Sequence, residues 1–64
     1  MLKKVYDKRI MVQVEKVSGI LFEIDENEAV VEFDHEVIVG YPSEKVFLVE
    51  DSSKNMKDYY KELG

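Results

Sequence analysis

Residues 18–33, SGILFEIDENEAVVEF, contain two runs in which apolar side chains recur at every second position, separated by an acidic turn. The recurring apolar residues are Ile20, Phe22, Ile24, Ala29, Val31 and Phe33. A period of two is typical of β-strands, whereas a helix would distribute these side chains around its axis. The stretch therefore predicts a β-hairpin with all six side chains on one face.

The turn of this hairpin is expected at Glu26 and Asn27, with Asn27 as a residue that tolerates positive φ. The expected cross-strand pairs are Ile24 with Ala29, Phe22 with Val31, and Ile20 with Phe33. Slipping this register by one residue would send Phe22 and Phe33 to opposite faces, so the apolar pattern specifies one register.

The flanking segments continue the strand pattern. Residues 10–15 alternate in the same way and predict a first strand, and Gly19 is expected to mark a bulge or sharp bend. A three-residue turn at 34–36 is predicted before a strand at 37–41, because it sets Phe33 opposite Val37 and Val31 opposite Val39. Pro42 ends that strand, residues 42–45 form one helical turn, and residues 46–49 form a last short strand.

The two chain ends have a different character. Residues 1–9 fit either one turn of helix or a loosely paired edge strand, and they hold the basic cluster Lys3, Lys4, Lys8 and Arg9. Residues 52–63 predict a helix capped by Ser52 or Ser53, with Lys54 and Asp58 forming an i,i+4 pair. The apolar stripe of that helix consists of Met56, Tyr59, Tyr60 and Leu63.

The strands also predict a second apolar face, formed by Leu21, Val30, Ile38 and Phe47. An antiparallel sheet that faces water carries polar side chains there, so something should cover these four. The C-terminal helix and a partner or second subunit are the two alternatives, and the helix is favoured. Burying four such side chains would contribute about 1.5–3 kcal/mol each.

Length and composition limit the function. With 64 residues the chain is predicted to be a single domain (1–9 N-terminal segment, 10–49 β core, 52–63 helix), and a homodimer is a further expectation because so small a core is marginal alone. It has no cysteine and no long apolar run, which favours a cytoplasmic protein away from membranes. The formal charge of −5 disfavours nucleic acid as a partner.

The fold class predicted from these observations is mainly β: about five short strands in a small barrel or bent antiparallel sheet, with a C-terminal helix. This order, with Gly19 and the helical turn at Pro42 before the last strand, resembles the SH3-like small barrels, including the KOW and Tudor groups, over residues 10–49. The chain has no Trp for gripping proline-rich peptides and no basic face like that of nucleic-acid-binding KOW modules. A Tudor-like cage for methyl-lysine would have only Phe33, Tyr41 and Phe47.

No residue pattern indicates catalysis, a metal or another cofactor. His35 lies between Asp34 and Glu36, but consecutive side chains in an extended segment diverge, so a polar turn is predicted there. Glu23 and Glu32 are treated as solubilising charges, and the serines have no base to activate them. The chain is therefore predicted not to be an enzyme.

The predicted function is a small acidic protein–protein interaction module, comparable in composition to accessory or phage-encoded regulators and inhibitors. The residues expected to contact the partner are Tyr41, Phe47, Tyr59 and Tyr60, because aromatic side chains contribute strongly at interfaces, although the same residues also suit the core. The main alternative is an inhibitor that mimics nucleic acid with Glu23, Asp25, Glu26, Glu28, Glu32, Asp34 and Glu36. Direct nucleic-acid binding through the N-terminal basic cluster ranks last.

Overall fold

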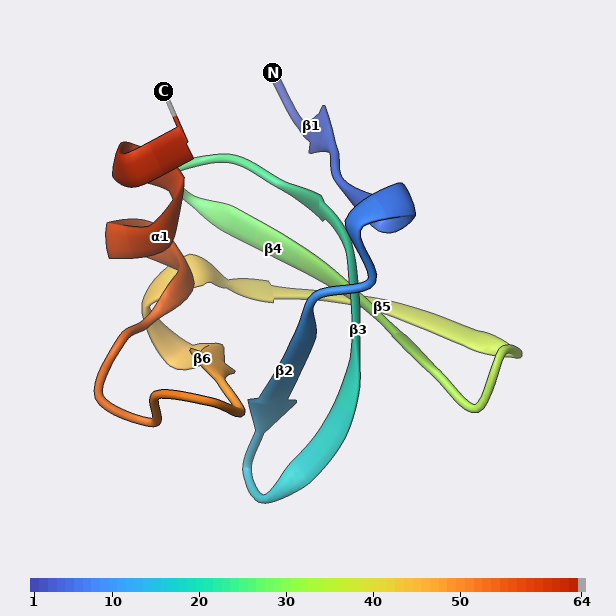
Figure 1. The fold of residues 1–64 in the computed structure, drawn as a ribbon. Helices are drawn as coiled ribbons and strands as arrows, with labels where there is room; N and C mark the ends of the chain where they lie inside the picture. The colour runs from blue at the N-terminus through green and yellow to red at the C-terminus, as the bar shows by residue number, and fades with distance from the viewer. Residues whose placement is uncertain (64) are drawn as a thin grey trace.

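The computed structural model describes residues 1–63, which form six short strands, two 3-10 turns and one α-helix (Figure 1). In chain order the elements are β1 (Lys3–Lys4), η1 (Tyr6–Lys8), β2 (Met11–Val14), β3 (Val17–Ile24), β4 (Glu28–Phe33), β5 (Val37–Pro42), η2 (Ser43–Lys45), β6 (Phe47–Leu48) and α1 (Met56–Leu63). The predicted fold class is confirmed, with a bent antiparallel sheet rather than a closed barrel.

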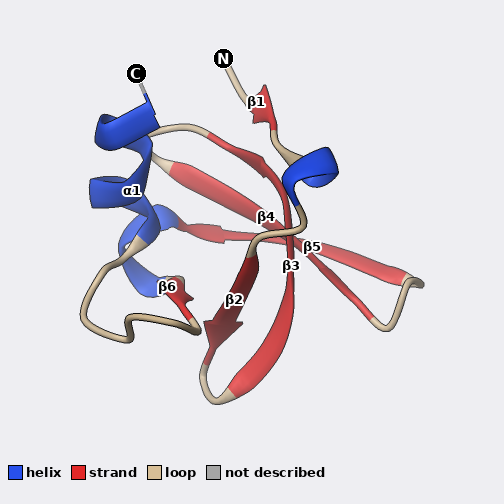
Figure 2. Cartoon of the chain, viewed as in Figure 1, coloured by secondary structure: helices blue, strands red, loops and turns tan. Residues whose placement is uncertain are grey.

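The sheet has the strand order β5-β4-β3-β2-β6, and β1 pairs with the end of β3 beyond β2. All neighbouring strands are antiparallel. Strong bending brings β2 and β6 across from β4, while the β4–β5 hairpin extends away from α1 (Figure 1). A long loop joins β6 to α1, which lies beside the bent sheet (Figure 2).

The β4–β5 hairpin has the predicted register. Phe33 pairs with Val37 and Val31 with Val39, so the three-residue turn at 34–36 is confirmed. Asp34 and His35 both adopt positive φ, and the Glu36 N–H donates to the Phe33 carbonyl (3.0 Å). This register places the apolar residues of both strands on the same face, so the pattern of apolar residues was sufficient to predict it.

The β3–β4 register departs from the prediction at a bulge. Ile24 pairs with Ala29 as expected, but Leu21, not Phe22, lies opposite Val31, because an extra residue is inserted between Leu21 and Glu23. The bulge turns Leu21 into the core, where it is fully buried, and leaves Phe22 half-buried. The predicted pairs of Phe22 with Val31 and Ile20 with Phe33 are therefore wrong.

Gly19 is not the site of the bulge, since it pairs regularly with Val12. It is buried where β4 crosses closely: a Cβ atom on Gly19 would lie 2.6 Å from Val31 Cγ1 and 2.7 Å from the Glu32 carbonyl oxygen. A residue without a side chain is required by this close approach.

The turn between β3 and β4 is organised by Asp25. Its Oδ1 accepts hydrogen bonds from the backbone N–H groups of Asn27 and Glu28, both at 2.7 Å. The expected positive φ at Asn27 is wrong, because none of the residues with positive φ lies in this turn. Asp25 supplies the turn hydrogen bonds with its side chain, as aspartate does in Asx turns.

The core lies inside the bend of the sheet. It consists of the fully or nearly fully buried Val5, Val12, Val14, Leu21, Ile24, Ala29, Val31, Val46 and Met56. Helix α1 begins at Met56 rather than at 52, and its cap is Asn55, whose Oδ1 accepts from the Asp58 N–H (2.9 Å), rather than Ser52 or Ser53. Lys54 pairs with Glu62 instead of Asp58.

The predicted second apolar face does not exist as one surface. Leu21 belongs to the core, Val30 and Phe47 are half-buried, and Ile38 is exposed. The C-terminal helix covers the core through Met56, not the outer face. It is the N-terminal segment that reaches the outer face, where the Tyr6 ring packs on Phe22 with centroids 5.2 Å apart.

Candidate functional site

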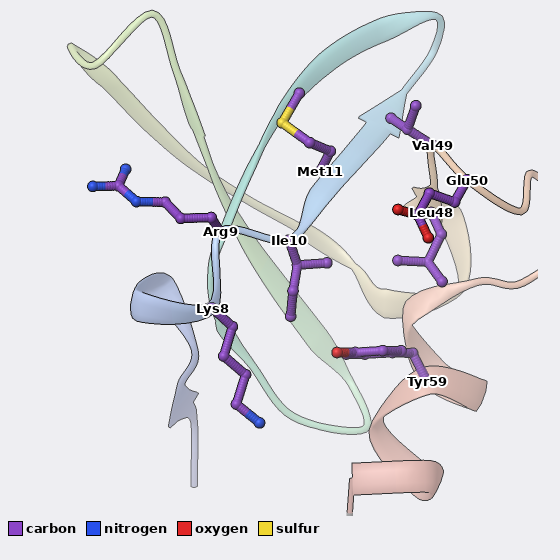
Figure 3. A pocket seen from close by; sticks show the side chains of 8 residues that line it. All are labelled: Lys8, Arg9, Ile10, Met11, Leu48, Val49, Glu50 and Tyr59. Carbon is purple, nitrogen blue, oxygen red and sulfur yellow. The ribbon is translucent and has the colours of Figure 1, made fainter.

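A groove of about 480 Å³ lies between the start of β2, the end of β6 and α1 (Figure 3). Its lining residues are Lys8, Arg9, Ile10, Met11, Leu48, Val49, Glu50 and Tyr59. Figure 3 shows the side chains of Ile10, Leu48 and Tyr59 converging on the same space, with Met11 and Val49 at one end of it.

Backbone hydrogen bonds fix the walls of this groove. Arg9 adopts left-handed φ and ends η1, which turns the chain into β2. The Val49 N–H donates to the Met11 carbonyl (3.1 Å) and joins the two long walls. The third wall is held because Met56 is fully buried and its N–H donates to the Val46 carbonyl (2.8 Å), which sets the position of Tyr59 one turn along α1.

The groove suits an apolar side chain better than a polar one. Its rim includes two unusually exposed apolar residues, Met11 (47%) and Val49 (44%), around half-buried Ile10 and Leu48. The charged residues in its lining are Lys8, Arg9 and Glu50. Apolar depressions with a polar rim are typical of protein- and ligand-binding sites.

The predicted contact residues are distributed over the molecule. Tyr59 lines the groove, whereas Tyr60 lies half-buried against the core from the same helix. Tyr41 is on β5, where its ring meets Phe33 edge to face at 6.3 Å, and Phe47 is on β6 opposite Gln13. Of the four predicted contact residues, only Tyr59 therefore lines the groove. The apolar walls of the groove are otherwise formed by Ile10, Met11, Leu48 and Val49, which were predicted only as strand residues.

The predicted acidic residues divide between the two ends of the β3–β4–β5 hairpins. Asp25, Glu26 and Glu28 lie at one end, and Asp34 and Glu36 at the other. Glu23 and Glu32 lie on the outer face between them, paired with Val30 and Ile20 respectively.

Glu32 is engaged by a cluster that sequence spacing did not reveal. The Tyr6 hydroxyl donates to Glu32 Oε1 (2.9 Å), and His35 Nδ1 lies 3.5 Å from the same oxygen. The Arg9 guanidinium stacks on the Tyr6 ring, 4.7 Å from its centroid. The cluster holds η1 on the outer face, and because Tyr6 and Glu32 are 26 residues apart, no local pattern could indicate it. His35 lies in the polar turn predicted for it.

The shifted pKa values belong to turns and to one ion pair. Hydrogen bonds from Glu28 and Asn27 lower the pKa of Asp25, and the Ser53 hydroxyl lowers the pKa of Asp51. The hydrogen bond to Glu62 raises the pKa of Lys54. Among residues 1–63 no group of three or more His, Cys, Asp or Glu side chains is placed to hold a metal ion. No helix in this part of the chain is both long and apolar enough to span a membrane.

Comparisons with protein-family models, with curated proteins and with solved structures found no match. The resemblance to SH3-like barrels thus stays a prediction from the order of strands and turns.

Proposed function

We propose that the chain is a protein-interaction module, not an enzyme, and that it binds an apolar side chain of a partner protein in the groove between β2, β6 and α1. The observation that carries the proposal is the convergence of Ile10, Leu48 and Tyr59 beneath the exposed Met11 and Val49. Apolar and aromatic groups that exclude water around one anchor residue supply most of the binding energy at such sites.

The rim adds a preference to this proposal. Lys8 lines the groove and has no ion pair among the described residues, whereas the Arg9 guanidinium stacks on Tyr6. A partner segment with an acidic residue next to its apolar anchor would complement this rim, although an exposed pair contributes only about 0.2–1 kcal/mol. The expected ligand is therefore an apolar-anchored, acidic-flanked segment, and a role as a cytoplasmic accessory regulator or inhibitor is part of the proposal.

A random peptide library displayed on phage tests the groove without knowledge of the partner. Selected peptides should share an apolar anchor, and in NMR titrations they should shift the signals of Ile10, Met11 and Val49 first. Met11→Glu should weaken their binding by about tenfold or more, since it places a charge at the rim of an apolar pocket.

The matched control is Val17→Glu, because Val17 is comparably exposed and lies outside the groove. Alanine at Tyr59 and Tyr60 is a poorer choice, since both side chains also pack on the core. Peptides that bind Met11→Glu as tightly as wild type, or that shift signals elsewhere, would refute the proposal that the groove is the binding site.

Mimicry of nucleic acid is the second candidate. The observation in its favour is that Glu26, Glu28, Asp34 and Glu36 are exposed and form no ion pair among residues 1–63. Binding of a basic partner by these carboxylates should weaken steeply as salt rises, because exposed charges are screened. Binding in the apolar groove should change little, so one salt series with an oligolysine peptide and a selected library peptide separates the two functions.

A further inference from the structure

The sheet protects all but one of its long edges. On β6 the Leu48 N–H donates to the Lys54 carbonyl (3.1 Å) and Phe47 bridges to Asn55, so the segment before α1 covers that edge. On β3 the second edge is shared between β2 and β1. Strand β5 pairs with β4 alone.

The backbone hydrogen bonds of β4 show which residues of β5 point their N–H and C=O groups toward the free edge. The Asp25 N–H donates to the Glu28 carbonyl and the Ser43 N–H to the Asn27 carbonyl, so odd-numbered residues of β4 point their backbone groups toward β5. Their partners are Val37, Val39 and Tyr41. Because direction alternates along a strand, the N–H and C=O groups of Ile38 and Gly40 point away from β4, and no residue among 1–63 bonds to them.

The side chains of β5 do nothing to discourage pairing. The strand, VIVGYP, contains no charged residue, and Val37 and Ile38 are each 52% exposed. Proteins normally protect a free edge with lysine, a bulge or a covering segment, and here only Pro42 at the strand end is of that kind. An open, apolar edge of this length is a template for another strand.

We propose that a second copy of this chain occupies the edge, with the two β5 strands antiparallel about a two-fold axis through Val39. Ile38 of each copy then exchanges both backbone hydrogen bonds with Gly40 of the other. Val39 faces its own copy, Val37 faces Tyr41, and Ile38 faces Gly40, beside which the exposed, flexible Glu28 carboxylate has to move aside.

Self-complementarity is the reason for choosing a second copy over an unrelated strand. In the Val39 register every facing pair from 37 to 41 is apolar, so β5 itself contributes no acidic side chain to the pairing. A register centred on Gly40 would pair Ile38 with Pro42, which has no N–H to donate. One centred on Ile38 would bring the charged Glu36 into the pairing.

Charge gives the dimer a distinctive signature. Each copy has a formal charge of −5, and the exposed Glu36 and Glu44 lie near the two ends of β5. Association must therefore overcome repulsion that salt screens. The dimer is expected to strengthen with salt, which is the opposite of the salt dependence of acidic mimicry.

Sedimentation velocity on the full chain tests this, over about 10 μM to about 1 mM protein, a range suited to an interface smaller than about 1,200 Å². In 0.5 M NaCl the dimer fraction should rise with protein concentration, and Ile38→Lys should raise the dissociation constant on the order of tenfold or more. Val17→Lys is the matched control, since it introduces the same charge at a comparably exposed valine away from β5 and should change the constant less than about twofold.

Hydrogen exchange measures the same contact residue by residue. The Ile38 and Gly40 amides should gain protection as protein concentration rises, whereas the Val39 amide, already bonded to β4, should be protected throughout. A chain that stays monomeric to about 1 mM in high salt, or dimers that persist equally in Ile38→Lys and Val17→Lys, would overturn the proposal.

Discussion

Replacing Gly19 with alanine tests the close crossing of β3 and β4. The added Cβ would lie 2.6 Å from Val31 Cγ1, 2.7 Å from the Glu32 carbonyl oxygen and 3.0 Å from Phe33 Cδ1. Val31 is fully buried and Glu32 contributes backbone atoms of the neighbouring strand, so neither can move without displacing β4. The methyl group must therefore push the two strands apart.

The magnitude follows from two opposing effects. Overpacking a core of this kind costs about 1–3 kcal/mol, and restricting the unfolded chain by Gly→Ala returns about 0.4–1 kcal/mol. A net loss of about 1–2 kcal/mol is expected, against a total stability of about 3–10 kcal/mol for a chain of this size. The unfolding midpoint should fall by roughly 5–15 °C.

Gly40→Ala is the matched control. Its Cβ would meet the carboxylate of Glu28, which is the far end of an exposed, flexible side chain and moves aside at little cost. This variant should lie within about 0.5 kcal/mol of wild type or be slightly more stable.

Both variants have negative φ at the substituted position, so the comparison isolates crowding from backbone strain. Urea unfolding followed by far-ultraviolet circular dichroism, at about 10 μM protein to avoid association, measures the difference. A Gly19→Ala variant as stable as wild type, or one less affected than Gly40→Ala, would refute the close approach of β4 to Gly19.

Three further predictions concern the helix and the turns. Met56→Ala should cost about 2–5 kcal/mol in urea unfolding, because Met56 is fully buried and attaches α1 to the core. Asn55→Ala should cost about 0.5–2 kcal/mol by removing the cap of α1, whereas Ser52→Ala, predicted from sequence as a cap, should change stability by less than about 0.5 kcal/mol. The lowered pKa of Asp25 stabilises the fold above the unfolded value of 3.8, and that contribution is lost as pH falls through the folded-state pKa. Asp25→Asn keeps an acceptor oxygen without titrating, so its thermal unfolding midpoint should fall less than that of wild type in this acid range.

The registers of the two hairpins show what a sequence pattern can and cannot specify. The β4–β5 pairing was predictable because a two-residue turn would have brought the charged Glu36 onto the apolar face. Around Phe22 both faces of β3 are apolar. The bulge therefore places Leu21 instead of Phe22 opposite Val31 without bringing a polar side chain into the core. Periodicity fixes a register only where the two faces differ in polarity.

The candidate groove was less predictable than the fold. Tyr59 was identified because aromatic residues are common in interfaces, but the rest of the groove depends on the long-range pairing of β2 with β6 and on the position of α1. For the same reason, the sequence predicted that the C-terminal helix covers the outer face of the sheet, whereas the N-terminal segment covers it. The Tyr6 hydroxyl binds Glu32 on the outer face. Because the two residues are far apart in sequence, no local pattern of residues could predict this contact.

The groove and the β5 edge have no residue in common, which makes the two proposals independent in experiment. Ile38→Lys should weaken pairing of the chain with itself and leave the affinity for a single selected peptide unchanged. Met11→Glu should weaken peptide binding and leave the pairing unchanged. A dimer linked through β5 carries two grooves, so a partner with two apolar segments should bind it more tightly than a single segment does, by an effective-concentration effect. Loss of that enhancement in Ile38→Lys, with single-segment affinity unchanged, is the result that only a β5-linked pair of grooves explains.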